Sequence, residues 1–329
     1  MRTTRRIGPL TALLLLLAAL ALGACGDDDD NDGGGAPDTP AGTADSAAIS
    51  SNPDNADTEI TVGSKNFTEQ KVLGEIFAQG LAAAGYKVDT ELNLGDEKTA
   101  LKAIEGGQID AYPEYTGTAL GSFFGVKSDQ IPKDPQAAFE QARKGFAEKG
   151  LTAYPPTPFT SSNEVALTSE KADELGVEKI SDLEGKAGDL TLFGSPECRQ
   201  REDCLLGLRR VYGLEFEKFT PVAIDLRHEV LEKGQADLSI VFTTDPQNKR
   251  DKLVLLEDDK GMFPPFNSTF VVRDETVKQA GGDLPEVIEQ VQEGLTAEVM
   301  QELNARVDLD KKTPKAVAGE YLRESGLVQ

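Results

Sequence analysis

The chain contains no tryptophan, and only one histidine, three cysteines and three methionines occur among its 329 residues. A lone histidine excludes the catalytic and metal sites that need two or more imidazoles. His228 lies in the helical pattern LRHEVLEKG, which predicts a structural role at the surface or half-buried. The motifs GxSxG and HExxH and a phosphate-binding loop are also missing. The sequence therefore argues against an enzyme, and we expect neither a metal nor a cofactor.

Positive charge is scarce in this sequence. Lysine and arginine together number 34 against 57 aspartates and glutamates, which gives a formal net charge of −23 at pH 7. Because like charges repel, this balance argues against nucleic-acid partners and against binding to an anionic membrane surface. It does not identify the partner that the protein does have.

Only one long apolar run is present, and it lies near the N-terminus. Residues 10–22 are almost entirely Leu and Ala, and they follow three arginines, which predicts a signal peptide over 1–24. The run ends in LGAC, which is similar to the bacterial lipoprotein box, and this resemblance implies that Cys25 carries lipid. An ordinary signal peptide with an incidental cysteine is the alternative. Either signal places the folded part outside the cytoplasm, and lipid would anchor it to the bacterial cell membrane.

Residues 25–58 have few large apolar side chains, so they cannot offset the entropy of folding, and we interpret them as a flexible tether. The acidic run at 27–30 is a solvated spacer in this interpretation. A calcium site is the alternative, but the glycine turn and distal glutamate of a calcium loop are missing.

The two remaining cysteines, Cys198 and Cys204, lie six residues apart in PECRQREDC. Outside the cytoplasm such a pair favours a disulfide that closes a small loop, with two free thiols as the alternative.

After residue 58, apolar spacing alternates between strand and helix, with Thr68 as the expected N-cap of the first helix. This rhythm predicts an α/β fold with a parallel sheet and helices on both faces. Two proline-rich crossings, at 154–158 and 261–266, divide the pattern. We therefore predict a discontinuous lobe, 59–160 with 268–329, and an inserted lobe, 161–267. A ligand cleft that closes by hinge motion is expected between them.

One stretch, IDAYPEYTGTAL at 109–120, carries two of the six tyrosines. We expect a strand to start at 108–111, a hydroxyl-rich turn with a glycine at 116–118, and an apolar helix to begin at Ala119, with Tyr112 and Tyr115 at this strand-to-helix junction. Ligands of open α/β sheets bind at such strand ends. Aromatic faces hold cations, and amides at a helix start hold anions. The stretch thus predicts a binding site for a small molecule with both charges, although core packing of both tyrosines is the alternative.

Several motifs together resemble one family. They are GSKNFTEQ from 63, DAYPEYTGT from 110, GSPExxxR from 194, FTTD from 242 and LEDDKxxFPPF from 256. In this order they are similar to the substrate-binding proteins of osmoprotectant ABC transporters, which bind glycine betaine, choline, carnitine or proline betaine. The resemblance spans residues 59–329 and implies a type II periplasmic-binding-protein fold.

The resemblance also implies a ligand site, in which an aromatic cage surrounds the trimethylammonium head and polar groups hold a carboxylate. Tyr115 would be a cage wall with Tyr112 nearby, and Phe242 and Phe266 would add walls. Arg201 would clamp the carboxylate, since a guanidinium can do so with two hydrogen bonds. The ligand-binding residues carried over are Lys65, Tyr112, Tyr115, Thr118, Asn163, Arg201, Phe242 and Phe266.

The sequence departs from the family pattern at several positions. Val165 stands where a cage tyrosine is usual, so the cage is expected to lack one wall. Glu164 beside it is expected to point away if the segment is a strand. Cys198 and Cys204 replace an aromatic residue and a glycine, which strengthens the disulfide interpretation, and the bond would stiffen the loop that carries Arg201.

The sequence as a whole predicts a lipid-anchored, monomeric receptor that delivers a quaternary-ammonium osmolyte to an ABC permease, with ATP hydrolysis in partner subunits. The first alternative keeps the fold and the transport role but binds another small polar solute, such as an amino acid. A secreted enzyme is the second alternative.

Overall fold

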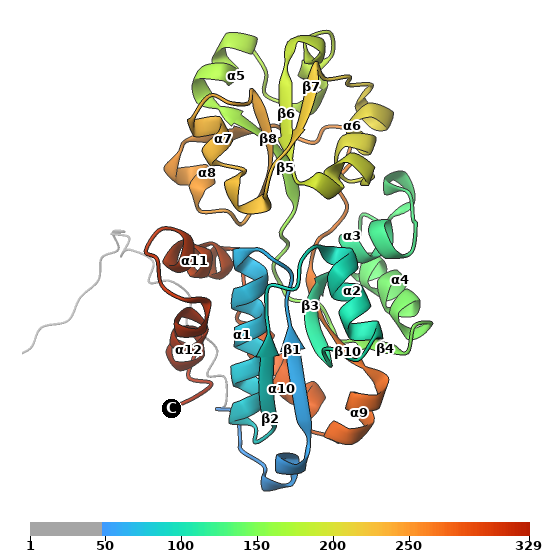
Figure 1. Ribbon diagram of the computed structural model, residues 1–329, viewed down its shortest axis with the longest axis vertical. Helices are drawn as coiled ribbons and strands as arrows, with labels where there is room; N and C mark the ends of the chain where they lie inside the picture. The colour runs from blue at the N-terminus through green and yellow to red at the C-terminus, as the bar shows by residue number, and fades with distance from the viewer. Residues whose placement is uncertain (1–47) are drawn as a thin grey trace, which may run out of the picture. The chain divides into compact units, whose positions relative to one another are not determined.

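The computed structural model describes residues 48–329, which belong to one compact unit, Thr43–Gln329. The predicted signal peptide, the lipidated Cys25 and most of the tether lie outside the described residues. Within the described part, two five-stranded sheets are joined by two crossing segments (Figure 1). No helix of this part has the length and apolar character needed to cross a membrane.

The first sheet has the strand order β2-β1-β3-β10-β4. β1 pairs in parallel with β2 and β3, whereas β10 is antiparallel to both β3 and β4. The parallel pairing predicted from the strand-helix rhythm is confirmed for β1, β2 and β3, and the antiparallel β10 was not predicted. β10 arrives directly from a crossing segment rather than through a crossover helix, so it can run antiparallel. The strands are β1 (Glu59–Gly63), β2 (Lys87–Glu91), β3 (Ala111–Tyr115), β4 (Leu151–Ala153) and β10 (Ser268–Arg273).

Helices pack on both faces of the first sheet and form two separate hydrophobic cores. One core contains Phe77 from α1 and Phe270 from β10, whose rings stack with centroids 4.1 Å apart. The other contains Ile109 and Phe146. The main helices are α1 (Thr68–Ala83), α2 (Glu97–Glu105), α4 (Pro135–Ala147), α9 (Asp274–Ala280), α10 (Leu284–Glu293), α11 (Ala297–Asp308) and α12 (Pro314–Glu324).

The second sheet has the order β7-β6-β8-β5-β9 and is also mixed, because β5 runs antiparallel to β8 and β9. Its strands are β5 (Asn163–Thr168), β6 (Thr191–Gly194), β7 (Lys218–Pro221), β8 (Leu238–Phe242) and β9 (Leu253–Leu255). Its helices are α5 (Ser169–Leu175), α6 (Leu205–Tyr212), α7 (Glu229–Glu232) and α8 (Gln247–Arg250). We call residues 59–160 with 268–329 the first lobe and residues 161–267 the second lobe.

The two crossing segments run side by side where the lobes meet. Thr160 forms an antiparallel bridge with Asn267, and the Ser161 amide donates to the Phe266 carbonyl at 3.1 Å. The second lobe therefore enters and leaves the first lobe at neighbouring points, which is the arrangement expected of a two-segment hinge.

The segment Tyr-Pro-Glu-Tyr is a strand, and the turn expected at 116–118 is instead a short helix. β3 begins at Ala111, runs through Tyr115, and passes directly into a helix, α3 (Thr116–Thr118), followed by a π-helical turn, Ala119–Phe123. Pro113 is tolerated because β1 pairs with β3 only at Ala111, so the proline needs no partner on that edge.

Three further local predictions were wrong. Phe67 rather than Thr68 occupies the N-cap of α1, because the Thr68 hydroxyl donates instead to Asp308 at 2.6 Å. The apolar spacing of 203–212 predicts a helix with Leu206 facing inward, but Leu206 is 36 % exposed. His228 is buried rather than half-buried, and it occupies the N-cap position of α7.

Candidate functional site

A cavity lies between the two lobes, and both lobes line it. The lined space is about 770 Å³ including its opening to solvent, which is in the range of small-molecule sites. The predicted residues that line it are Lys65, Tyr115, Thr118, Asn163, Arg201, Phe242 and Phe266. Other side chains on its wall, which the sequence analysis did not assign, include Phe67, Glu97, Arg227 and Ile240.

Four aromatic rings line the cavity, from Phe67, Tyr115, Phe242 and Phe266. The Phe67 ring stacks near Tyr115 with centroids 6.3 Å apart, and it contacts Phe242 of the second lobe at 5.3 Å. Phe67 thus joins the aromatic walls of the two lobes. The sequence motif GSKNFTEQ could have indicated this role of Phe67, because Phe67 is an apolar residue between the end of a strand and the start of a helix. Ring faces without competing donors are what a quaternary ammonium needs.

The two tyrosines of β3 face opposite ways, because side chains alternate along a strand. Tyr115 lines the cavity, and its hydroxyl donates to the buried Glu69 at 2.6 Å. Burial and the Glu69 carboxylate raise the pKa of Tyr115 well above its usual value. Tyr112 lies in the other core of the first lobe, where its hydroxyl donates to Glu114 at 3.1 Å. The structure does not bring Tyr112 into the cavity.

Lys65 follows β1 and extends into the cavity, where its ammonium forms a buried ion pair with Glu114. The ammonium Nζ lies 4.6 Å from the centroid of the Tyr115 ring. Glu114 also accepts the Tyr115 amide at 2.7 Å and is fully buried. The positive charge of Lys65 is therefore balanced by a carboxylate that lies behind the cavity wall.

Arg201 lies on the loop between β6 and α6, and the disulfide between Cys198 and Cys204 closes this loop with Cα atoms 5.2 Å apart. Its guanidinium Nε donates to Asp203 at 2.7 Å, and a second, shorter contact engages the other carboxylate oxygen. Across the cavity Nη2 reaches the Thr118 hydroxyl at 3.4 Å. Burial would lower the pKa of Arg201, but Asp203 raises it above its usual value. Arg201 is thus already paired.

Asn163, the first residue of β5, lines the cavity beside this loop. Its side-chain nitrogen donates to the main-chain carbonyl of Asp203 at 3.1 Å. Asn163 therefore helps to hold the carboxylate that pairs with Arg201.

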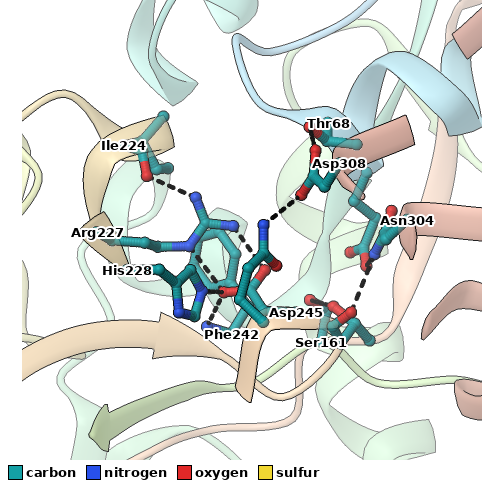
Figure 2. Close-up of polar contacts among 12 residues, drawn as sticks. Thr68, Ser161, Ile224, Arg227, His228, Phe242, Asp245, Asn304 and Asp308 are labelled. Carbon is teal, nitrogen blue, oxygen red and sulfur yellow. Dashed lines mark hydrogen bonds and ion pairs between the residues drawn. The ribbon is translucent and has the colours of Figure 1, made fainter. Parts of the chain in front are cut away.

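A second buried arginine, Arg227, supports the Phe242 wall (Figure 2). Its guanidinium carbon lies 4.7 Å from the Phe242 ring centroid, and its Nε donates to Asp245 at 2.7 Å. His228 Nε2 lies 2.9 Å from the same carboxylate, which also accepts the Phe242 amide at 2.9 Å. Burial opposes ionisation, but Arg227 holds the pKa of Asp245 well below its usual range. The network fixes one wall of the cavity.

Val165 was expected to leave the aromatic cage without one wall, and its position in the structure bears on that expectation. Val165 is fully buried in β5 and does not line the cavity, whereas Ile240, which pairs with it on β8, does. Glu164 is not on the cavity wall either. Phe67 instead supplies a fourth ring, so the aromatic wall is not one ring short.

Polar contacts also join the lobes beside the cavity (Figure 2). The Asn304 amide of α11 donates to Glu69 at 3.0 Å and to the Thr244 carbonyl of the second lobe at 3.2 Å. Gln247 donates to Asp308 at 2.9 Å. Burial raises the pKa of Glu69, which several donors contact. α11 therefore forms a buried contact with the turn after β8.

Within residues 48–329, no group of three or more His, Cys, Asp or Glu side chains is placed to hold a metal ion. The cavity instead combines ring faces at one part of its wall with hydroxyl, guanidinium and carboxylate groups at another. Such a wall can hold a small solute that has a cationic head and a polar end.

Comparison with known proteins gives a consistent result. A family model described as the substrate binding domain of ABC-type glycine betaine transport system matches residues 58–324. A glycine-betaine-binding protein of Pseudomonas aeruginosa is 35 % identical over 280 residues, which cover 82 % of this chain and 88 % of that protein. An ergothioneine transport permease/ergothioneine binding protein of Helicobacter pylori is 30 % identical over 270 residues, 82 % of this chain but 48 % of that longer protein.

Among solved structures, a glycine betaine/carnitine/choline ABC transporter protein superposes with a TM-score of 0.66 at 24 % identity, covering 82 % of this chain and 99 % of the other. This likeness confirms the predicted periplasmic-binding-protein fold. The family match covers both lobes and most of the described residues. The chain therefore belongs to the family of substrate-binding domains of ABC-type glycine betaine transport systems.

Proposed function

We propose that this protein captures a betaine-type solute with a quaternary ammonium between its two lobes and delivers it to an ABC permease. The observation that carries the proposal is that Phe67, Tyr115, Phe242 and Phe266 line one cavity together with polar groups of both lobes. A quaternary ammonium has no hydrogen-bond donor, so ring faces are its specific partners. Each ring contributes roughly 0.5–2 kcal/mol when water is excluded.

Each polar residue has a distinct role in this proposal. Thr118 and Arg201 meet across the cavity at 3.4 Å and hold the polar end of the solute. Asn163 keeps Asp203, and through it Arg201, in place. Lys65 adds a positive charge near Tyr115. Tyr112 takes part only through Glu114, which also holds Lys65.

The location follows from the N-terminal sequence. Signal cleavage after residue 24 and lipid on Cys25 anchor the receptor outside the cytoplasm, and the tether lets the lobes reach a permease. ATP hydrolysis belongs to separate subunits, and the receptor acts as a monomer without nucleic acid. Incorporation of labelled fatty acid, lost in Cys25→Ser, tests the anchor.

A second candidate has the same fold and transport role but a different small polar ligand. It is favoured by the pairing of Lys65 with Glu114 and of Arg201 with Asp203, because neither cation is free for a ligand carboxylate. A secreted enzyme has less support. Among the described residues, the cavity wall contains no histidine, and its two cysteines are joined in a disulfide.

Calorimetric titration of the full chain with glycine betaine, choline, carnitine and proline betaine tests the function. We expect at least one of these four solutes to bind. Tyr115→Leu should weaken the binding of that solute by about 5- to 30-fold, which corresponds to 1–2 kcal/mol of ring contact. Binding of an amino acid, polyamine or sugar with no response to these four solutes would show that the ligand class is wrong.

A further inference from the structure

Glu97, the first residue of α2, has a carboxylate oxygen without a partner at the cavity. The side chain is 3 % exposed and lines the cavity, and its Oε1 has no hydrogen bond to any described residue. Its Oε2 lies 3.6 Å from Arg201 Nη1, beyond the distance of a good hydrogen bond. Arg201 directs its close contacts to Asp203 instead. Because buried carboxylate oxygens are normally hydrogen-bonded, this one requires an explanation.

The charges around the cavity indicate what Glu97 faces. The three cations on the wall, Lys65, Arg201 and Arg227, are each paired with a carboxylate that is not on the wall, namely Glu114, Asp203 and Asp245. Among the carboxylates on the wall, Glu97 reaches Arg201 only at 3.6 Å, and within residues 48–329 neither Asp96 nor Glu197 forms an ion pair with any of the three cations. The potential inside the cavity favours a positive charge or a hydrogen-bond donor.

Glu97 also lies at the opening of the cavity. It lines a second, outer hollow together with Asp96, Glu197, Glu202 and Arg201. A solute whose ammonium contacts the rings and whose other end lies at Arg201 is therefore close to Glu97, which lies 3.6 Å from that guanidinium. A quaternary ammonium itself cannot donate to a carboxylate, so the partner must be another group of the solute.

We propose that Glu97 accepts a hydrogen bond from an O–H or N–H group of the solute, and so selects quaternary-ammonium solutes that carry such a donor over betaines that have only a carboxylate. This inference rests on the proposed function and specifies its ligand class. Asp96 does not share the role, because its carboxylate accepts from the Thr99 amide and hydroxyl at the start of α2.

The test compares choline and glycine betaine, which share a trimethylammonium head but end in a hydroxyl and a carboxylate. Ergothioneine is a third probe, with a trimethylammonium group, a carboxylate and a ring N–H. Calorimetric titration of the full chain is repeated with Glu97→Gln. We expect about 10-fold weaker binding of choline and ergothioneine, as for one charge-assisted hydrogen bond. Glycine betaine should bind unchanged or more tightly, because repulsion of its carboxylate is removed.

Glu105→Gln is the matched control, since it makes the same change on the exposed, far end of α2, where Glu105 pairs with Lys149 at 2.7 Å. It should leave the affinities for all three solutes unchanged.

Glu97→Asp keeps the charge but shortens the side chain, so it should also weaken the binding of choline more than the binding of glycine betaine. This variant replaces Glu97→Gln in the test if Glu97→Gln does not fold. Equal changes for choline and glycine betaine, or no change, would overturn the role of Glu97 while leaving the proposed function intact. Failure of the unmodified chain to bind these three solutes, and carnitine and proline betaine as well, would overturn both.

Discussion

At the scale of single residues, Phe67 adds a fourth ring to an aromatic wall that has none from position 165. Its ring lies between Tyr115 of its own lobe and Phe242 of the other. Because it occupies the N-cap of α1, it is fixed by the junction between β1 and the helix. It contacts a ring of each lobe, and so it joins the two sides of the cavity.

We expect Phe67→Leu to weaken binding of the quaternary-ammonium solute by about 5- to 30-fold, because leucine keeps the burial but removes the ring face. Calorimetry measures the change. Phe124→Leu is the control, since Phe124 packs on Phe146 at 5.3 Å outside the cavity and should leave the affinity unaltered. An unchanged affinity for Phe67→Leu would remove Phe67 from the cage.

Glu164 is a second residue whose environment has a measurable effect. Burial, with Asp258 nearby, raises the pKa of Glu164 from 4.5 to about 7. The folded protein therefore binds a proton more tightly here than the unfolded chain does. Its stabilising contribution is complete below pH 4.5 and is lost as pH rises through 7.

We expect the free energy of unfolding to fall over this pH range by at most about 3 kcal/mol from this group, and Glu164→Gln to remove that part of the fall. Urea unfolding of both proteins at pH 4.5 and pH 8 measures it. Glu184→Gln, on an exposed carboxylate, should leave the pH dependence unaltered. A variant with the full pH dependence of the parent would show that Glu164 ionises normally.

The sequence predicted much of the wall at this scale. Motif resemblance placed Tyr115, Thr118, Arg201, Phe242 and Phe266 in a site, and all five line one cavity. It could not show that Arg201 is paired with Asp203 or that Tyr112 faces the other core. Both depend on side-chain direction and on tertiary contacts, which a motif does not encode.

At the scale of elements, the loop that carries Arg201 depends on a covalent link. Cys198 and Cys204 are six residues apart, and the second cysteine immediately precedes α6. The bond fixes both ends of the loop, so the guanidinium is held near Thr118. Closing a loop of this length restricts the unfolded chain by about 2 kcal/mol.

We expect the double variant Cys198→Ser with Cys204→Ser to lose about 2 kcal/mol of unfolding free energy and to bind solute several-fold more weakly. Denaturant unfolding and calorimetry measure the two effects. Dithiothreitol should reproduce both in the parent protein and change nothing in the double variant. A reductant effect that persists in the double variant would point to another cause.

The sequence predicted helices better than strands at this scale. The strong apolar spacing of 284–293 predicts a helix over these residues, and α10 has the same bounds. The short strands β4 and β7 were not predicted, since three or four residues carry little periodic signal. The direction of β10 was missed as well, because pairing direction depends on the route of the chain in space.

At the scale of the whole molecule, two of the sets of contacts that join the lobes away from the crossings differ in burial. One is the buried set at Asn304, which links Glu69 with the Thr244 carbonyl. The other is exposed, where Arg210 lies 3.2 Å from Asp129 and donates to Ser128 at 2.7 Å. Opening of the cavity must break both sets. Buried hydrogen bonds are worth more than exposed ion pairs.

We expect Asn304→Ala to raise the dissociation constant by about 10-fold, because a buried carboxylate and a carbonyl lose their donor. Arg210→Met should change it by less than about 3-fold, since surface pairs contribute little and are screened by salt. Titrations at low and high salt measure both. A larger effect from Arg210→Met would show that the exposed set dominates closure.

The bridge between Thr160 and Asn267 has a consequence for how this family diversifies. The second lobe is one continuous segment whose two ends lie together, so exchanging it for the segment of a relative cuts the first sheet nowhere. Arg201 and Phe242 would be replaced in that single exchange, while Glu97 and Tyr115 would stay. Ligand preference is therefore open to change by recombination of one stretch of coding sequence, without point mutations in the lobe that holds β3.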